Sequence, residues 1–176
     1  MKDRKLLNIE LRRVSPDEYK MLPESGIVVV LDNIRSAHNV GSAFRTADSF
    51  KADKVILCGI CAMPPSAEIH KSALGAEDSV EWEHFDDTMD AVASLKADGY
   101  TVVSVEQTVN SVKLNDFKPV PGHRYALIFG NEVDGVRQDV VDASDFSLEV
   151  PQWGTKHSLN VSVTVGVILW HLRLFL

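Results

Sequence analysis

Short runs of apolar residues, each followed by a polar, helix-like stretch, repeat along the chain. Runs that are apolar throughout are typical of strands buried on both faces of a parallel sheet. Helix-like patterns are expected at about 40–50, 86–98 and 136–143, the middle one capped by Asp86 and ending at Gly99. The alternation predicts an α/β fold with a mostly parallel sheet flanked by helices. The expected strands are 27–31, 54–58, 101–105, 125–129 and 146–150, with a further one near 80–85.

The first 25 residues differ from the rest in charge. Apolar residues between 6 and 11 are flanked by basic residues, and Ser15 and Glu18 have the spacing of a capping box. Residues 1–20 hold six Lys and Arg against four acids, a net of +2, so that the remainder carries −9 of the total charge of −7. We interpret 1–25 as a basic N-terminal helical arm and 26–176 as one globular domain. An anionic partner such as nucleic acid would have to meet a local basic patch.

The last segment, 158–176, reads SLNVSVTVGVILWHLRLFL and is apolar nearly all round. A helix of this kind is expected to be buried on every side. It is either a central core helix of a monomer or a helix shared with a second subunit, and its terminal position favours a dimer interface. The apolar part is shorter than the roughly 20 residues of a spanning helix, and the N-terminus is polar, so we expect a cytoplasmic protein outside the membrane.

Two cysteines, Cys58 and Cys61, form a C-x-x-C pair. A redox pair normally opens a helix, whereas this one follows the strand-like KVILCG. No second Cys or Cys/His pair completes a tetrahedral metal set. We therefore expect structural or incidental thiols and no metal site.

Polar residues gather directly after the first apolar run, in NIRSAHNVGSAFRTADSF at 33–50. Ligands of open α/β sheets bind beyond the carboxyl ends of strands, so a site is expected here. Asn39 is expected to cap a helix that opens at Val40, and Gly41 lets the backbone pass close to another group. Arg45 lies about one turn further along, an arrangement suited to an anion such as phosphate.

Three clusters lie at the ends of predicted strands: NIRSAHNVGSAFRTAD at 33–48, LIFGNEVDGV at 127–136 and EVPQWGTKHSLNVSVTVG at 149–166. In this order and spacing they closely resemble the three signature motifs of the SpoU-type, or TrmH-type, RNA ribose 2'-O-methyltransferases of the SPOUT superfamily. The resemblance covers about 26–172. It implies a C-terminal trefoil knot, S-adenosylmethionine (AdoMet) bound in that knot, and a homodimer with its active site near the subunit boundary.

The resemblance also implies roles for individual residues. Arg45 matches the family's catalytic arginine, either as the base or as a group that stabilises a developing alkoxide or clamps a phosphate, because an arginine pKa above about 12 makes a base unusual. The implied catalytic set is Arg45, Asn39, Glu132, Ser158 and Asn160. The implied cofactor-binding set is Glu106, Gly130, Val150 and Leu159.

Other interpretations stay open at this point. Arg45 could pair with Asp48 or Asp53 on a helix surface, and Asn39 could be only a cap. Arg35, His38, Lys71 and Ser72 are candidate RNA contacts or surface residues, and Trp153 could stack on a base, close over the cofactor or pack. The substrate is expected to be RNA, with tRNA favoured over rRNA. The alternatives are an RNA-binding module without activity and a Rossmann-type enzyme, although no G-x-G-x-x-G follows the first strand.

Overall fold

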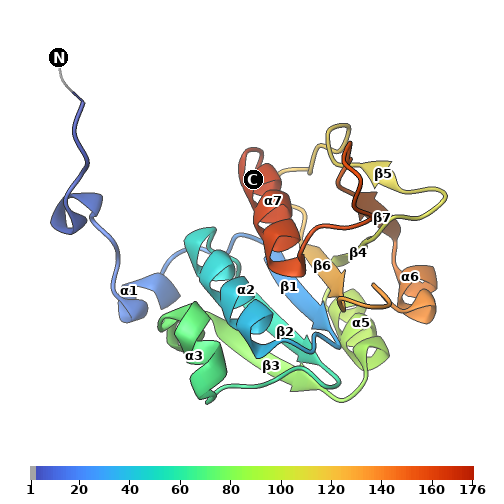
Figure 1. Cartoon of the computed structure of the whole chain (residues 1–176), viewed down its shortest axis with the longest axis horizontal. Coiled ribbons are helices and arrows are strands. Elements are labelled where there is room, and N and C mark those ends of the chain that lie inside the picture. Colours follow the sequence, from blue (N-terminus) through green and yellow to red (C-terminus); the bar gives the residue numbers. More distant parts are fainter. Residues whose placement is uncertain (1–2) are drawn as a thin grey trace.

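Seven parallel strands form one sheet with helices on both faces in the computed structural model, which describes residues 3–176 (Figure 1). The sheet order is β3-β2-β1-β6-β4-β7-β5, and every pairing among these strands is parallel. The predicted α/β class is therefore confirmed. The strands are β1 (Ile27–Asp32), β2 (Lys54–Cys58), β3 (Glu81–Phe85), β4 (Thr101–Val105), β5 (Val112–Lys113), β6 (Tyr125–Gly130) and β7 (Phe146–Glu149).

Seven α-helices and one short 3-10 helix accompany the sheet in the described residues. The helices are η1 (Asn8–Leu11), α1 (Pro16–Lys20), α2 (Ala37–Ser49), α3 (Ala67–Ala73), α4 (Ala76–Ser79), α5 (Thr88–Ala97), α6 (Gln138–Ala143) and α7 (Val161–Arg173).

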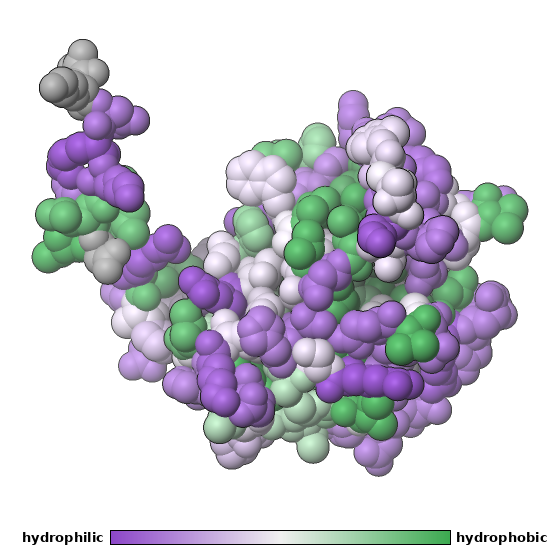
Figure 2. Space-filling view, in the orientation of Figure 1, coloured by the Kyte–Doolittle hydropathy of each residue, from purple (hydrophilic) through white to green (hydrophobic). Residues whose placement is uncertain are grey.

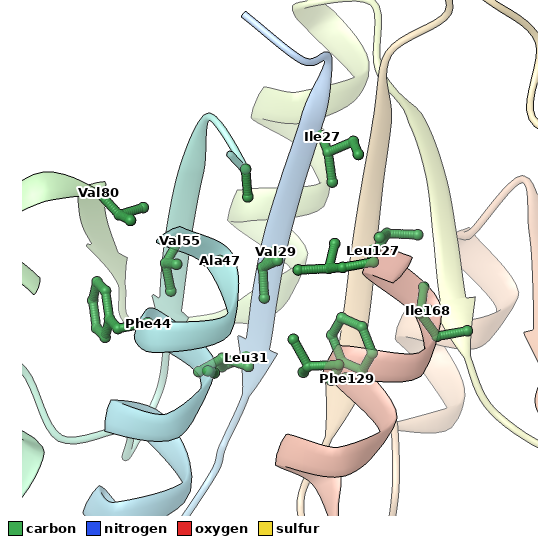
Figure 3. Packing of buried hydrophobic residues seen from close by; sticks show 14 of the residues in the cluster. Ile27, Val29, Leu31, Phe44, Ala47, Val55, Val80, Leu127, Phe129 and Ile168 are labelled. Atoms are coloured by element: carbon green, nitrogen blue, oxygen red, sulfur yellow. The ribbon is translucent and has the colours of Figure 1, made fainter. Parts of the chain in front are cut away.

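The alternation of side chains along β1 assigns these helices to the two faces of the sheet. Ile27, Val29 and Leu31 belong to the larger apolar cluster, which also holds buried residues of α2, α3 and α7. Val28 and Val30 point the other way, into a cluster with residues of α5 and α6. Figure 3 shows the first cluster, with Phe44 of α2 and Ile168 of α7 against the central strands. The central strands are thus covered on both sides, as their continuous apolar runs predicted.

The start of α2 corrects one expectation. Ser36, not Asn39, caps this helix, because the Ser36 side chain accepts the Asn39 backbone N–H at 3.2 Å. The helix therefore begins at Ala37, three residues before the expected Val40. Asn39 lies in the first turn with its amide side chain free to bond elsewhere. A similar one-residue error concerns α5, which is capped by Asp87 and not by Asp86.

Gly41 permits a close contact between two helices. A Cβ built on Gly41 would lie 2.3 Å from the Ile69 carbonyl oxygen and 2.2 Å from the Ser72 hydroxyl. The group expected to approach the backbone at Gly41 is therefore the helix α3. Ser72 is buried there and donates to the His38 carbonyl oxygen at 2.9 Å, so its interpretation as an RNA contact is wrong.

The N-terminal arm is anchored at one end and projects at the other. Its capping box is confirmed, since Ser15 N–H donates to the Glu18 carboxylate at 2.7 Å and the Ser15 side chain accepts the Glu18 N–H. Tyr19 is buried in the main apolar cluster, and its hydroxyl donates to the Ala52 carbonyl oxygen at 3.3 Å. The segment before Ser15 stands away from the body (Figure 1), and hydrophobic side chains around η1 are exposed (Figure 2).

The terminal helix α7 is buried on one side only. Val165, Ile168 and Leu172 are buried against the sheet and α2, whereas Val163 and Trp170 are 51% and 58% exposed. The expectation of burial on every side is therefore wrong for the single chain. The outer face of α7 remains apolar and uncovered within the described residues.

Candidate functional site

A pocket of about 490 Å³ opens where the carboxyl ends of the central strands meet the start of α7. Three segments line it: 105–107 at the end of β4, 129–135 at the end of β6, and the segment from the end of β7 to the first turn of α7. A pocket beyond the carboxyl ends of parallel strands is where an α/β sheet presents ligand-binding loops. The lining residues are Val105, Glu106, Gln107, Phe129, Gly130, Asn131, Glu132, Val133, Asp134, Gly135, Glu149, Val150, Gln152, His157, Ser158, Leu159, Asn160, Val161 and Thr164.

Seven of the nine predicted site residues lie on this lining. They include the four expected cofactor-binding residues, Glu106, Gly130, Val150 and Leu159. The others are Glu132, Ser158 and Asn160 from the expected catalytic set. Arg45 and Asn39 are not part of the lining.

Two glycines shape the loop between β6 and α6. A Cβ on Gly130 would lie 1.9 Å from the Gly135 carbonyl carbon, and Gly135 has a φ of +70°. A Cβ on Gly135 would also lie 2.2 Å from an oxygen of Glu106. Asn131 closes the turn, because its side-chain oxygen accepts the N–H groups of Val133 and Asp134, each at 2.9 Å. The loop can be this tight only without side chains at both glycines.

Glu106, directly after the neighbouring strand β4, holds this loop. Its two carboxylate oxygens accept the N–H of Gln107 at 2.8 Å and of Val136 at 3.0 Å. Gln107 in turn donates to the His157 carbonyl oxygen at 2.6 Å and so ties the β4 loop to the loop before α7. The sequence analysis assigned no role in the site to Gln107 or Asn131. For Gln107, its position next to the expected cofactor-binding residue Glu106 could have indicated such a role.

A chain of hydrogen bonds joins the three sequence clusters at the mouth of the pocket. The Asn39 side-chain amide donates to Glu132 Oε1 at 2.7 Å, and the Asn160 amide donates to Asn39 Oδ1 at 3.2 Å. Asn160 also caps α7, because its oxygen accepts the N–H of Ser162 at 2.9 Å. Packing of α2 against α7 makes these contacts feasible (Figure 1). Residues more than 90 positions apart thus form one polar cluster.

Arg45 lies apart from this cluster. It is exposed on α2, six residues beyond Asn39, which corresponds to about 9 Å along the helix axis. Within residues 3–176 it forms no ion pair, whereas Asp53 is engaged with Lys51 and with the N–H groups of Ser25 and Gly26. The pairing of Arg45 with Asp53 is therefore not observed.

Several other candidate residues are now placed. Trp153 is 93% exposed in the loop before α7, which excludes packing within the described chain. Lys71 pairs with Glu68 on the surface of α3 at 2.6 Å, and Arg35 and His38 are exposed.

The two cysteines lie in the interior of the protein and not in the pocket. Both are buried and free, and Cys61 accepts the Ile34 N–H and donates to the Leu31 carbonyl oxygen. Burial raises the pKa of Cys58 to about 12 and that of Cys61 to about 11. Among residues 3–176 no group of three or more His, Cys, Asp or Glu side chains is arranged to hold a metal ion. No helix in the same range is long and apolar enough to cross a membrane.

Residues 26–170 match the SpoU rRNA Methylase family, and the chain belongs to this family. It is 32% identical over 167 residues to a 23S rRNA (guanosine-2'-O-)-methyltransferase RlmB of Nitrosomonas europaea, across 92% of this chain and 62% of the relative. An AdoMet-bound rRNA methyltransferase from Sinorhizobium meliloti superposes with a TM-score of 0.79 at 27% identity, across 92% of this chain and 60% of the other. The A. aeolicus TrmH/SpoU tRNA modifying enzyme shares the fold, with a TM-score of 0.77 at 24% identity over 95% of this chain and 83% of the other.

The chain spans a little over three fifths of the length of the curated relatives it matches first. Their names describe larger proteins, so the activity of this chain has to be argued from its own site.

Proposed function

We propose that the protein is an AdoMet-dependent methyltransferase that modifies a ribose 2'-hydroxyl in RNA. The observation that carries the proposal is the hydrogen-bonded cluster of Asn39, Glu132 and Asn160 at the mouth of the strand-end pocket. It brings together the three motifs on which the family resemblance rests. Membership of the SpoU family and the similarity to an AdoMet-bound rRNA methyltransferase support the same conclusion.

The residues present fit AdoMet. The pocket volume of about 490 Å³ lies within the usual range of small-molecule sites. Its wall includes the glycine-bounded loop 130–135 and the segment around Val150. Its lining includes four carboxylates and, in the described part of the chain, no lysine or arginine, which suits a sulfonium cation better than a phosphate. Glu106, Gly130, Val150 and Leu159 would hold the cofactor, which supplies an activated methyl group.

The reaction then requires a 2'-hydroxyl oxygen aligned with that methyl group and relieved of its proton. Positioning and electrostatic stabilisation supply most of such catalysis. Arg45 would take part either as the base or by stabilising the developing alkoxide and clamping an adjacent phosphate. Asn39, Ser158 and Asn160 would orient the ribose or Arg45, and Glu132 would hold Asn39 in place.

We further propose that the active enzyme is a homodimer with its active site near the subunit boundary. Two features of the single chain support this: Arg45 lies about 9 Å along α2 from the pocket mouth, and the outer face of α7 exposes Val163 and Trp170. A second copy on that face would cover the apolar side chains. The C-terminal trefoil knot implied by the family belongs to the same proposal.

The finer assignments remain part of this proposal. We favour tRNA over rRNA as the substrate, a cytoplasmic location, and a division into a basic arm (1–25) and a catalytic domain (26–176). The relatives include proteins named for either RNA.

The test is methyl transfer by the purified full chain from radiolabelled AdoMet to total tRNA and to rRNA. Mass spectrometric mapping would then locate the 2'-O-methylated nucleotide. Arg45→Ala should lose transfer while AdoMet affinity measured by calorimetry stays within about threefold, because Arg45 is outside the pocket lining. Saturable AdoMet binding without transfer to either RNA would favour the non-catalytic RNA-binding module. Absence of AdoMet binding would overturn the proposed function.

A further inference from the structure

A carboxyl group that the proposed reaction does not use lies beneath the pocket wall. Asp32 is the last residue of β1 and is completely buried. It alternates with Val28 and Val30 and therefore lies on the face of the sheet covered by α5 and α6. A buried carboxyl group is costly unless hydrogen bonds satisfy it, so its partners indicate why it is there.

The partners of Asp32 come from three segments. Its Oδ1 accepts the Thr88 hydroxyl at 2.5 Å and the Asn33 side-chain amide at 2.8 Å. Its Oδ2 accepts the backbone N–H of Arg137 at 3.3 Å. Asp32 thus links the end of β1 to the first residue of α5 and to the residue that caps α6.

Asp32 and Glu106 bind backbone N–H groups of two neighbouring residues, Arg137 and Val136. Glu106 accepts the N–H of Val136, and Asp32 accepts the next N–H. Asp32 also lies beside Gly130 in the register of β1 and β6, which is where the same loop begins. The carboxyl group at the end of β1 and the one directly after β4 therefore hold the consecutive amides of Val136 and Arg137, which immediately follow the loop 131–135 that forms one wall of the pocket.

We propose that Asp32 is a positioning residue that fixes this wall of the pocket and thereby sets the affinity for AdoMet. The proposal rests on the proposed function for its ligand. Asp32 does not line the pocket, so its effect must pass through Arg137 N–H and the loop. The loop also carries Glu132, the partner of Asn39.

Asp32→Asn is the first test. In one orientation the new amide NH2 would face the Arg137 N–H, and in the other it would face the Asn33 amide NH2, so it meets a donor in both, even though the Thr88 hydroxyl can turn to accept. A buried hydrogen-bonding group left unsatisfied predicts a rise in the AdoMet dissociation constant of roughly 10- to 100-fold. The kcat at saturating AdoMet should stay within about threefold, since ligand binding restores the wall.

Thr88→Val is the matched control for stability. It removes the hydroxyl donor to the other oxygen of Asp32 and leaves the Arg137 contact in place. It should lower the melting temperature, as Asp32→Asn does, and leave AdoMet affinity within about twofold. Equal loss of affinity in the two variants, or unchanged affinity in Asp32→Asn, would overturn the proposal.

A second pair of variants removes the contact from the side of the loop and keeps the test available if Asp32→Asn does not fold. Arg137→Pro deletes the backbone N–H at a residue whose φ of −54° suits proline, whereas Arg137→Ala keeps that N–H. Affinity should fall in the proline variant and stay near wild type in the alanine variant. Equal affinities would refute the role of this N–H.

Hydrogen exchange separates failure of this proposal from failure of the proposed function. Without any ligand, the amides of residues 131–137 should lose protection in Asp32→Asn and keep it in Thr88→Val. If the wild-type chain binds no AdoMet, the proposed function fails, while this readout still decides whether Asp32 holds the loop. Unchanged protection in Asp32→Asn would refute the positioning role.

Discussion

The hydrogen bond between Asn39 and Glu132 offers a sharp test of the polar cluster, because two substitutions can exchange its donor and its acceptor. The Asn39 amide donates to Glu132 Oε1 at 2.7 Å and accepts from Asn160 at 3.2 Å. Asn39→Asp keeps the shape and the acceptor for Asn160 but places a second carboxylate against Glu132. Glu132→Gln alone keeps an oxygen that can accept from Asn39. In the double variant the new glutamine amide can donate to the new carboxylate.

The magnitude follows from the geometry. A hydrogen bond to a charged group is worth about 1.5 kcal/mol at the lower end of its range, which is appropriate because the pair is solvent-accessible. Repulsion between two carboxylates about 4 Å apart in water adds about 1 kcal/mol. A loss of about 1.5 to 2.5 kcal/mol in the transition state predicts a fall in kcat of roughly 10- to 70-fold for Asn39→Asp. Glu132→Gln alone should change kcat by less than about threefold.

The assay is single-turnover methyl transfer at saturating AdoMet, with AdoMet affinity measured in parallel. We expect the double variant to recover at least about half of the lost free energy, which is a positive coupling in a double-mutant cycle. The two side chains act independently if the double variant is no more active than Asn39→Asp. In that case the observed hydrogen bond does not contribute to catalysis.

Three further predictions concern the rest of the chain. Cys58 and Cys61 should resist thiol reagents at pH 8 until the protein unfolds, since the reactive thiolate forms only near their raised pKa values of about 12 and 11; rapid labelling of the native protein would contradict this. Trp153→Ala should weaken RNA binding by roughly 5- to 100-fold and Trp153→Phe should weaken it less, as measured by filter binding; equal effects would exclude base stacking. Deletion of residues 1–14 should flatten the salt dependence of RNA binding by roughly 0.7 to 0.9 per lost phosphate contact; lower thermal stability with an unchanged slope would mean that the arm only supports the fold.

The central strands could be predicted because they are apolar on both faces and rich in β-branched residues, and because a run of five or six residues is too short for a typical helix. Ile27–Asp32 and Tyr125–Gly130 are the clearest examples. The helices α3 and α4 were missed, since seven and four residues are too few to establish a helical period. β5 was missed for the same reason, because its two residues acquire their conformation from pairing with β7.

The cap of α2 shows a different limit. Ser36 and Asn39 are both good capping residues, and they stand three positions apart. The sequence alone does not decide between them. The structure selects Ser36, whose side chain accepts the Asn39 N–H, and this choice releases the Asn39 side chain for Glu132 and Asn160. If Asn39 is assigned as the cap, its side chain is expected to bond to the helix backbone, and the contacts with Glu132 and Asn160 that join the motifs are not predicted.

The candidate site was predictable only as far as the motifs reach. Comparison of motifs placed Glu106, Gly130, Val150 and Leu159 together, and all four line one pocket. Periodicity and composition could not have done so, since the contacts depend on which strands become neighbours. The order β1-β6-β4-β7 is a property of the folded sheet. The burial of Asp32 is similar: its position after five apolar residues was visible, but its partners Thr88 and Arg137 were not.

The distribution of charge around the pocket suggests how an acidic protein could act on RNA. Of the four carboxylates in the lining, Glu106 is bonded to backbone amides, Glu132 to Asn39, and Glu149 to Lys113 and Ser111. The contacts with Lys113 and Ser111 hold the pKa of Glu149 below its usual value, so this carboxylate stays ionised at neutral pH. Such a lining favours a cationic ligand inside the pocket and repels phosphates. The RNA backbone would then approach from outside, over α2, where Arg45 is exposed and free of ion pairs within residues 3–176. On this argument the separation of Arg45 from the pocket follows from electrostatics, because an arginine among the lining carboxylates would be neutralised before it could meet a phosphate.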